Sequence, residues 1–261
     1  MRARSRSQHR SGAPAPPAHR DGAAAQPSAL SGPPSERVRV RRRRERGSYE
    51  RDVIDAILDE ALVAHLGIVA HDGQPLVIPT LHARVGDLVY LHGSAAGRTL
   101  LALAEGAPAC LTVSLIDGLV LARSAMHHSA NYRSVMMLGK ATHVDDPAAK
   151  RAAFRAIVEH IVPGRWPDAR APSENELKAT AVLAMRIEEA SAKVRTGPPV
   201  DDEEDYALPA WAGVIPLCTQ AGAPEADPRL AAGIRAPAYA RAYRRPLASS
   251  PRAQPAQSSR F

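Results

Sequence analysis

Hydrophobic positions in the middle of the chain repeat with two different periods, and each period predicts a different kind of element. From Val53 to Ala61 apolar residues recur at helical spacing with acidic residues between them, which predicts one amphipathic helix. From Leu76 to Ala141 short apolar runs are separated by turn residues, which predicts four antiparallel strands. The middle of the chain is therefore expected to be mainly β, with helices at its periphery.

Turn and capping residues predict where the other elements begin and end. Asp146 followed by Pro147 is typical of a helix start, and Ser173 with Glu176 matches a capping box. Hairpin-linked strands with peripheral helices favour a small α+β barrel over a parallel doubly wound sheet. The expected strands are 65–70, 75–84, 88–92, 109–115, 119–123, 132–144, 181–187 and 211–217, with turns at 72–73, 86–87 and 117–118 and a short helix over 98–103.

The two ends of the chain differ from this middle region in composition. Residues 1–48 and 218–261 are dominated by Arg, Pro, Ala and Ser without a sustained period, which predicts disordered tails around one domain over 49–217. The tails carry the positive charge, because the middle holds 15 basic and 22 acidic residues. Nucleic-acid binding through runs such as Arg41–Arg44 is the least favoured of three hypotheses for function.

The cysteine, histidine and hydropathy patterns indicate the cellular compartment and whether a metal site or a membrane segment is expected. Cys110 and Cys218 lie far apart without zinc-type spacing, which indicates a reducing compartment and a cytoplasmic protein. An uninterrupted apolar run long enough for a bilayer is lacking, so we expect no contact with a membrane. His127 and His128 are neighbours that would point to opposite faces of a strand, and we expect no metal site.

A turn from a strand into a helix is the strongest candidate for chemistry. Ser94, Arg98 and Thr99 lie among small residues, where hydroxyls, a guanidinium and backbone N–H groups can bind a phosphate. The segment matches neither a Walker loop nor a nucleophile elbow, and an ordinary turn with a surface arginine is the alternative. Arg133 begins an apolar strand from which it could reach a phosphate. Lys193 and Arg195 are further candidates for anion binding, whereas residues 201–205 indicate a solvated acidic loop.

Taken together in order, these motifs resemble the pyridoxamine 5'-phosphate oxidase-like, FMN-binding split-barrel superfamily, in the branch of flavin-nucleotide-binding proteins related to nitroimidazole resistance. The resemblance runs from about residue 46 to 217 and implies a homodimer that holds FMN between its subunits. By the family pattern, the first group of cofactor-binding residues would lie along the isoalloxazine, the second would bind the phosphate and the third would approach from a neighbouring strand. These groups are Pro79, Thr80, Leu81 and His82; Ser94, Arg98 and Thr99; and Asn131, Tyr132 and Arg133.

The resemblance also implies an activity. We expect an FMN-dependent oxidoreductase that passes electrons from NAD(P)H to a small acceptor, with His82 and His128 as candidate proton donors. A non-catalytic module of the same fold that stores or binds flavin, haem or a deazaflavin is the alternative. Trp211 is not followed by the arginine and histidine with which pyridoxamine oxidases bind pyridoxal phosphate, so oxidation of that substrate is disfavoured.

Overall fold

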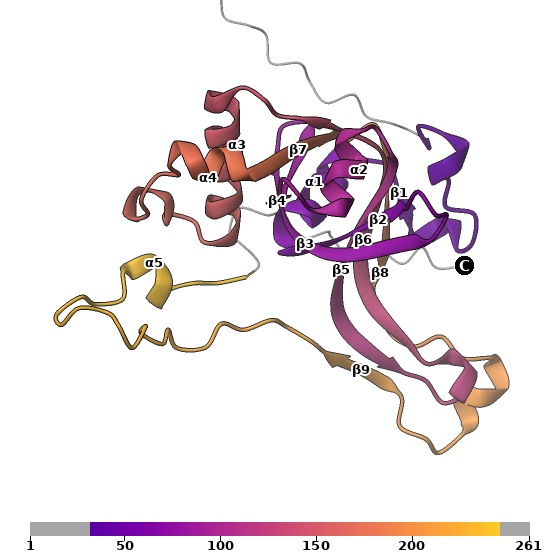
Figure 1. Ribbon diagram of the computed structural model, residues 1–261. Coiled ribbons are helices and arrows are strands. Elements are labelled where there is room, and N and C mark those ends of the chain that lie inside the picture. The colour runs from indigo at the N-terminus through magenta and orange to yellow at the C-terminus, as the bar shows by residue number, and fades with distance from the viewer. Residues whose placement is uncertain (1–31, 246–261) are drawn as a thin grey trace, which may run out of the picture.

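The computed structural model describes residues 32–245, and strands dominate this part of the protein (Figure 1). The strands are β1 (Gly47–Ser48), β2 (Val63–Val69), β3 (Pro75–Val85), β4 (Leu88–Ser94), β5 (Pro108–Leu121), β6 (Ser129–His143), β7 (Thr180–Arg186), β8 (Glu189–Arg195) and β9 (Gly213–Pro216). The helices are α1 (Arg51–Glu60), α2 (Arg98–Ala104), α3 (Pro147–Ile161), α4 (Glu174–Ala179) and α5 (Ala238–Arg241). Short 3₁₀ turns lie at Glu36–Val38, Arg44–Arg46, Ala125–His127, Trp166–Asp168 and Glu203–Ala207.

The strands close on themselves because β5 pairs with both β2 and β6. Within residues 32–245 the strand order is β1-β8-β6-β7-β4-β3-β2-β5-β9, and the additional pairing of β6 with β5 closes a ring that leaves β1, β8 and β9 outside. One half of β6, residues 132–138, pairs with β8, and the other half, residues 141–143, pairs with β7. The sheet is thus a partly closed antiparallel barrel that splits along β6, which confirms the predicted split barrel.

The interior of this barrel is filled by alternate strand residues and by α1. Ile54, Ile57 and Leu58 of α1 are at most 1% exposed, so the predicted amphipathic helix is confirmed, and its apolar stripe lies in the core. Burial of each such side chain contributes about 1.5–3 kcal/mol. The inward residues of the strands include Leu66, Leu91, Leu111, Val135, Met137, Leu183 and Met185.

The predicted turn at Asp117–Gly118 is wrong. β5 runs on through this point, and the register of its ladder with β6 shifts between Ile116 and Gly118, which marks a β-bulge. A Cβ on Gly118 would lie 3.0 Å from the carbonyl oxygen of Ile215 and 3.0 Å from Val214, so the glycine permits β9 to approach. Asp117–Gly118, which indicated a turn, therefore forms a bulge within one long strand.

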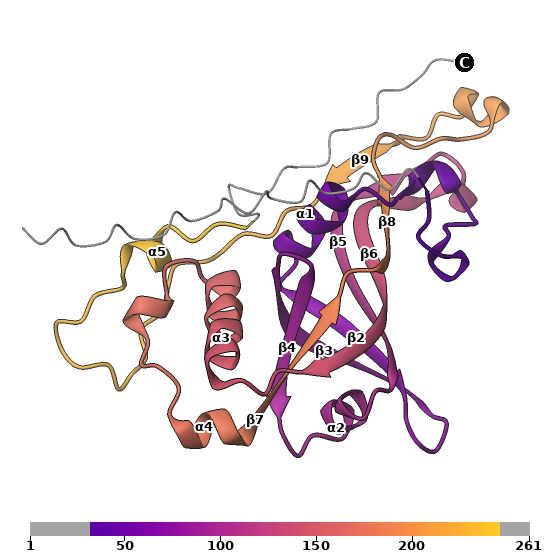
Figure 2. The same cartoon turned by 90° about the horizontal axis from the view of Figure 1, so that it is seen from above.

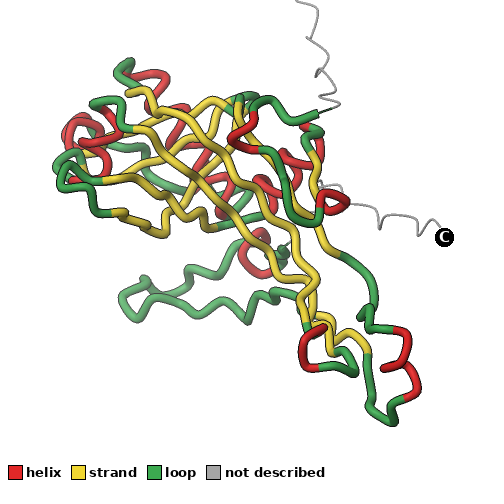
Figure 3. Tube along the Cα trace, turned by 90° about the vertical axis from the view of Figure 1, so that its right-hand side faces the viewer, coloured by secondary structure: helices red, strands yellow, loops and turns green. Residues whose placement is uncertain are grey.

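This long strand forms an arm outside the barrel. We define the arm as the β5–β6 hairpin over residues 116–133 together with β9 and the segment 196–212 that leads to it. Figure 3 shows the arm extending from the barrel and ending in two short helical turns, and the second view shows α3 and α4 on the opposite side (Figure 2). The predicted caps of these two helices are confirmed, because Asp146 accepts from the N–H of Ala149 and Ser173 forms a capping box with Glu176.

Structure begins before residue 49. Residues 36–42, which we call the N-terminal strap, cross the outside of the barrel, and Val38 within them is 1% exposed. The N–H of Val40 donates to the hydroxyl of Tyr49 at 2.8 Å, and β1 pairs with β8. The domain thus begins earlier than its composition indicated, since one buried valine and a few hydrogen bonds are enough to hold a basic segment.

Structure also continues after residue 217. Residues 218–245, the C-terminal strap, return from β9 to α3 (Figure 2). The hydroxyl of Tyr243 donates to the carbonyl of Ile161 at 2.9 Å, and the guanidinium of Arg245 donates to the carbonyls of His160 and Asp59 at 2.7 and 3.3 Å. The remainder of the expected tails, residues 1–31 and 246–261, lies outside the described residues. Among residues 32–245, none of the helices combines the length and the hydropathy needed to cross a bilayer.

Candidate functional site

A cavity, called the large cavity below, lies where the arm leaves the barrel. It has a volume of about 650 Å³ and is bounded by the end of α1, the start of β2, the middle of β5 and the end of β9. Apolar groups form most of its wall, and His65 and Arg245 are among its polar members. The residues that line it are Glu60, Ala61, Leu62, Val63, His65, Ser114, Leu115, Ile116, Asp117, Arg133, Thr196, Pro216, Leu217, Cys218, Thr219 and Arg245.

A segment of β3 that was predicted to bind cofactor lies one strand away from this cavity. Pro79 pairs with His65 and Leu81 pairs with Val63, so these residues share a face of the sheet with the cavity wall. Val77 and Ile78, which point to opposite faces, are 65% and 36% exposed. Residues 77–81 thus present apolar surface that the described part of the chain leaves largely uncovered.

The phosphate turn follows β4. His82 of β3 pairs with Leu91, and β4 runs from there toward Ser94, so the turn lies at the same end of the strand pair as Pro79–Leu81. The side chain of Arg98 is exposed and forms no ion pair within residues 32–245. Ser94 is exposed as well, and its hydroxyl accepts from the N–H of Ala96 at 3.3 Å. With Thr99 half-buried beside it, the turn offers an unpaired guanidinium and two hydroxyls.

His82 is separated from these residues, although it belongs to the same strand. Its side chain is fully buried, and its Nε2–H donates to the carbonyl of Leu58 at 3.0 Å. Burial, together with the neighbouring imidazole of His160, lowers the pKa of His82 to about 4. The ring is therefore neutral near pH 7, and its Nδ1 has no hydrogen-bond partner within residues 32–245. This environment is that of a core residue beneath α3.

Arg133 is held by two carboxylates. Its guanidinium donates to Glu60 at 2.8 Å and to Asp117 at 2.7 and 2.9 Å, and these hydrogen bonds raise its pKa. Glu60 is only 9% exposed, so the ion pair of Glu60 with Arg133 is largely shielded from solvent on the wall of the large cavity. With its donors used in this way, Arg133 is better placed to fix α1 against β5 and β6 than to bind a free phosphate.

Asn131 and Tyr132, which precede Arg133, make contacts at the base of the arm. Asn131 is 9% exposed, donates to the carbonyl of Gly197 at 3.1 Å and accepts from the guanidinium of Arg195. Tyr132 is half-buried and pairs across the sheet with Ile116 and Arg195. Arg195, an expected anion binder, is thus occupied at the point where β8 ends.

His128 lies at the tip of the arm, far along the hairpin from His82. It is exposed, and its Nδ1 lies 3.0 Å from the carbonyl of Ser124. The two candidate proton donors, His82 and His128, are consequently not brought together. The structure instead groups Pro79–Leu81 with the turn from Ser94 to Thr99, and groups Asn131–Arg133 with the arm.

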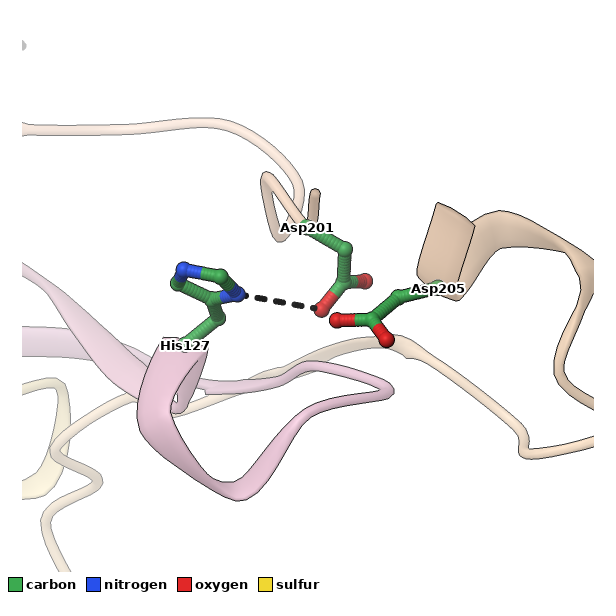
Figure 4. Close-up of side chains that lie close together, drawn as sticks. All are labelled: His127, Asp201 and Asp205. Atoms are coloured by element: carbon green, nitrogen blue, oxygen red, sulfur yellow. Dashed lines mark ion pairs between the residues drawn. The ribbon is translucent and has the colours of Figure 1, made fainter. Parts of the chain in front are cut away.

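The arm tip holds a cluster of His127, Asp201 and Asp205 (Figure 4). One potential ligand atom from each residue lies within 4.8 Å of the others. The carboxylate of Asp201 already accepts from the N–H groups of Arg123 and Ser124 at 3.0 and 3.2 Å and from the Arg123 guanidinium at 3.1 Å. These bonds outweigh burial and lower the pKa of Asp201. The cluster, which we call the latch, is best described as a set of ion pairs and hydrogen bonds that joins the segment 196–212 to the end of β5.

The same latch corrects the expectation of a solvated acidic loop over 201–205. The side chain of Asp201 is fully buried, and only its neighbours toward Asp205 follow the expectation. A run of acids carries no local signal that its first member contacts a strand end 78 residues earlier in the chain.

A second cavity, of about 410 Å³, lies under the N-terminal strap against β5, β6 and β8. Sequence reasoning missed it, because its floor is formed by residues that only the strand register brings together. Its lining comprises Val38, Arg39, Val40, Arg41, Arg42, Thr112, Val113, Ser114, Ser134, Val135, Met136, Ser191 and Lys193.

Comparison with known proteins accounts for this architecture. The family model described as pyridoxamine 5'-phosphate oxidase matches residues 50–194, more than half of the chain. The chain belongs to this family. The resemblance deduced from the motifs is thereby confirmed, and the matched span runs from the start of α1 to the end of β8.

Two solved structures are similar to most of the chain. The flavocytochrome Anf3 from Azotobacter vinelandii is 48% identical with a TM-score of 0.76, over 80% of this chain and 96% of its own. The FAD and heme binding protein from Mycobacterium smegmatis is 40% identical with a TM-score of 0.71, over 74% of this chain and 95% of its own.

A putative 5-nitroimidazole antibiotic resistance protein from Bacteroides thetaiotaomicron is 25% identical with a TM-score of 0.49, over 57% of this chain and 86% of its own. Among curated proteins the chain has no match.

Proposed function

We propose that the protein is a flavin-dependent redox protein that works as a homodimer. The observation that carries the proposal is that the exposed apolar segment Val77–Leu81 lies at the same end of the β3–β4 pair as the turn bearing Arg98. The guanidinium of Arg98 forms no ion pair among residues 32–245. A flavin has an apolar ring system and an anionic phosphate, and these two surfaces match those two parts. The similar structures described as a flavocytochrome and as an FAD and heme binding protein support the same proposal.

In this proposal each part of the chain has a separate role. Backbone of Pro79–Leu81 would lie along the ring, and Arg98 with Ser94 and Thr99 would bind the phosphate. The flavin, FMN or FAD, supplies the transfer of a hydride or of single electrons when bound. Electrons would come from NAD(P)H and pass to a small acceptor. The buried His82 would shape the wall behind the ring, and proton transfer by His82 is disfavoured by its burial under α3.

A second candidate function adds haem to the flavin. The observation that favours it is His65, an exposed imidazole on the largely apolar wall of the large cavity. Imidazole is a common axial ligand of haem iron, and Arg245 on the same wall carries the charge that propionates need. The descriptions of both similar structures name haem or a flavocytochrome. His65 would hold the iron, and haem would supply a one-electron partner for the flavin.

Uncovered apolar residues on the arm support the proposed homodimer. Ile116, Leu119 and Ile215 are between 44% and 51% exposed, and they lie on adjoining strands. Apolar surface of this kind is typical of a protein interface. A second copy would cover it and close the cofactor site between the subunits. Light scattering after size-exclusion chromatography should give twice the chain mass of 27.8 kDa.

The decisive experiment identifies the chromophore. The full chain is purified and its absorption spectrum recorded, and the released compound is then identified by mass. We expect the absorption bands of an oxidised flavin, and we expect these bands to bleach on addition of NADH or NADPH. A Soret band that is lost in His65→Ala, with the flavin bands kept, would support haem at His65. A colourless chain that does not bind added FMN or FAD would refute the proposal.

A further inference from the structure

The cavity beneath the N-terminal strap has a floor of hydroxyl groups. Ser114, Ser134 and Lys193 are successive partners across β5, β6 and β8, and the row two residues away holds Thr112, Met136 and Ser191. Val113, Val135 and Ala192, between these rows, are at most 1% exposed and point into the barrel. Side chains alternate along a strand, so both rows point outward into the cavity.

The roof of the cavity is cationic. The strap contributes Arg39, Arg41 and Arg42, and the floor adds the ammonium group of Lys193. Glu36 pairs with Arg39 and Arg41, with shortest separations of 2.6 and 3.8 Å. Arg42 and Lys193 form no ion pair within the described residues 32–245, and none of the residues that line the cavity is acidic. The cavity therefore holds net positive charge that residues 32–245 do not neutralise.

The arrangement of these donors suits a chain of phosphates better than a single one. Neighbouring strands lie about 4.8 Å apart, so the row from Ser114 to Lys193 spans roughly 10 Å. The Ser114 hydroxyl and the Lys193 ammonium group at the two ends of this strip can bind successive phosphoryl groups, with Arg42 above them. The Ser134 hydroxyl between them donates to the carbonyl of Lys193 at 3.3 Å. A lone phosphate would use only one end of this strip.

The cavity also adjoins the larger one. Ser114 lines both cavities, and His65 on the wall of the larger cavity pairs directly with Thr112 on the floor of the smaller one. An extended ligand can therefore run across one face of the sheet from the apolar cavity to the cationic one.

We propose that the cavity under the N-terminal strap binds the diphosphate of an adenine dinucleotide, with Lys193 and Arg42 as its principal cations. The inference rests on the proposed function in that the dinucleotide is either the flavin cofactor itself, as FAD, or the nicotinamide donor. The nicotinamide donor is the preferred source, because the flavin's own phosphate is assigned to Ser94, Arg98 and Thr99. The two phosphates of FAD share one bridging oxygen, so they cannot lie both at that turn and on β5, β6 and β8.

The test compares the nicotinamide nucleotide with FAD and FMN on one double variant. Arg42→Gln with Lys193→Gln removes both unpaired cations while it keeps polar side chains of similar length. We expect the KM for NADH or NADPH to rise by roughly 10- to 100-fold, since two charge-assisted hydrogen bonds to the nicotinamide nucleotide are lost. The affinities for FAD and FMN, measured by quenching of flavin fluorescence, should change less than about twofold. Arg44→Gln, in the same basic run but outside the cavity lining, is the matched control. Thermal unfolding of each variant checks that the fold is kept.

Two further measurements identify which nucleotide supplies the diphosphate, and they test the diphosphate site separately from the proposed function. If the KM for NADH or NADPH is unchanged but FAD affinity falls in the double variant alone, the diphosphate site is supported with FAD as its source, and the assignment of the FAD phosphate to Arg98 is wrong. ADP is also titrated into the flavin-free full chain by calorimetry. Wild-type binding that the double variant loses supports this site even if neither flavin binds and the proposed function fails. Unchanged binding of FAD, NAD(P)H and ADP in the double variant overturns the inference.

Discussion

His82 of β3 and His160 of α3 face each other beneath α3, with ring centroids 5.0 Å apart and ring planes inclined by 51°. Each ring contacts a backbone carbonyl near the end of α1, that of Leu58 for His82 and that of Ala61 for His160 at 2.8 Å. Burial lowers the pKa of both imidazoles, so the pair joins the helix to the barrel in its neutral form.

This pair predicts that acid destabilises the fold. The pKa of His82 is about 4 when folded and about 6.5 when unfolded, so between these values the unfolded chain binds more protons. The contribution of His82 is therefore present above pH 6.5 and is lost as the pH falls toward 4, by about 2 kcal/mol between pH 7 and pH 5. Urea denaturation at the two pH values measures this. His82→Gln should flatten the dependence, whereas exposed His71→Gln should not; equal slopes in both variants would contradict the assignment.

The carboxylate of Glu60 predicts a second effect on stability. Glu60→Gln would leave the guanidinium of Arg133 with Asp117 alone in a site where Glu60 is 9% exposed. Breaking a buried ion pair is costly, and we expect the free energy of unfolding to fall by about 2 to 4 kcal/mol. Glu188→Gln, at an exposed glutamate without an ion pair among residues 32–245, should change it by less than about 0.5 kcal/mol. Similar losses in both variants would mean that the ion pair contributes little.

Arg98 provides a prediction on binding instead of stability. Arg98→Ala removes the unpaired guanidinium of the β4–α2 turn, and we expect affinity for FMN and FAD alike to fall by roughly 10- to 100-fold, since both carry the same proximal phosphate. Arg155→Ala on the exposed face of α3 removes a comparable charge and should leave affinity unchanged. Flavin titration monitored by fluorescence checks both variants. Retention of full affinity in a dimeric Arg98→Ala protein would place the phosphate elsewhere.

Gly118 tests the bulge. Gly118→Ala would place its Cβ 3.0 Å from the backbone of Ile215, and we expect a loss of roughly 1 to 2 kcal/mol through a strained β5–β9 pairing. Gly139→Ala in β6 is a suitable control, because its Cβ would meet only the flexible end of Met185 at 3.8 Å. Hydrogen exchange should show faster exchange in β9 of the first variant and not of the second. Protection that is equal in the two would count against a tight approach at this glycine.

Features that depend on neighbours in the chain could be predicted from the sequence. The stripe of α1, the caps at Asp146 and Ser173 and the hairpins from Gly73 to Gly86 have local causes, and the structure confirms them. The bulge at Gly118 could not be predicted, because an Asp-Gly pair also suits a turn and only the approach of β9 decides between the two.

The candidate site was predictable only in part for the same reason. Ser94 and Arg98 share one turn, so their proximity could be deduced. The partner of Arg133 is Glu60, 73 residues earlier, and the cationic cavity depends on the register of β5, β6 and β8, neither of which leaves a periodic signal. The burial of His82 could not be predicted either, because His160 of α3, which packs against it, is far along the chain.

The bond from Arg245 to the carbonyls of Asp59 and His160 has a consequence for dissecting the protein. Those two carbonyls belong to the last turns of α1 and α3, where a cation offsets the partial negative charge of a helix end. Arg245 also lines the large cavity, so the same side chain caps the ends of two helices and forms part of the cavity wall. The span shared with the family, 50–194, is therefore smaller than the unit that this chain folds as, and fragments trimmed to the family boundaries are expected to lose both helix anchoring and the shape of the cofactor site.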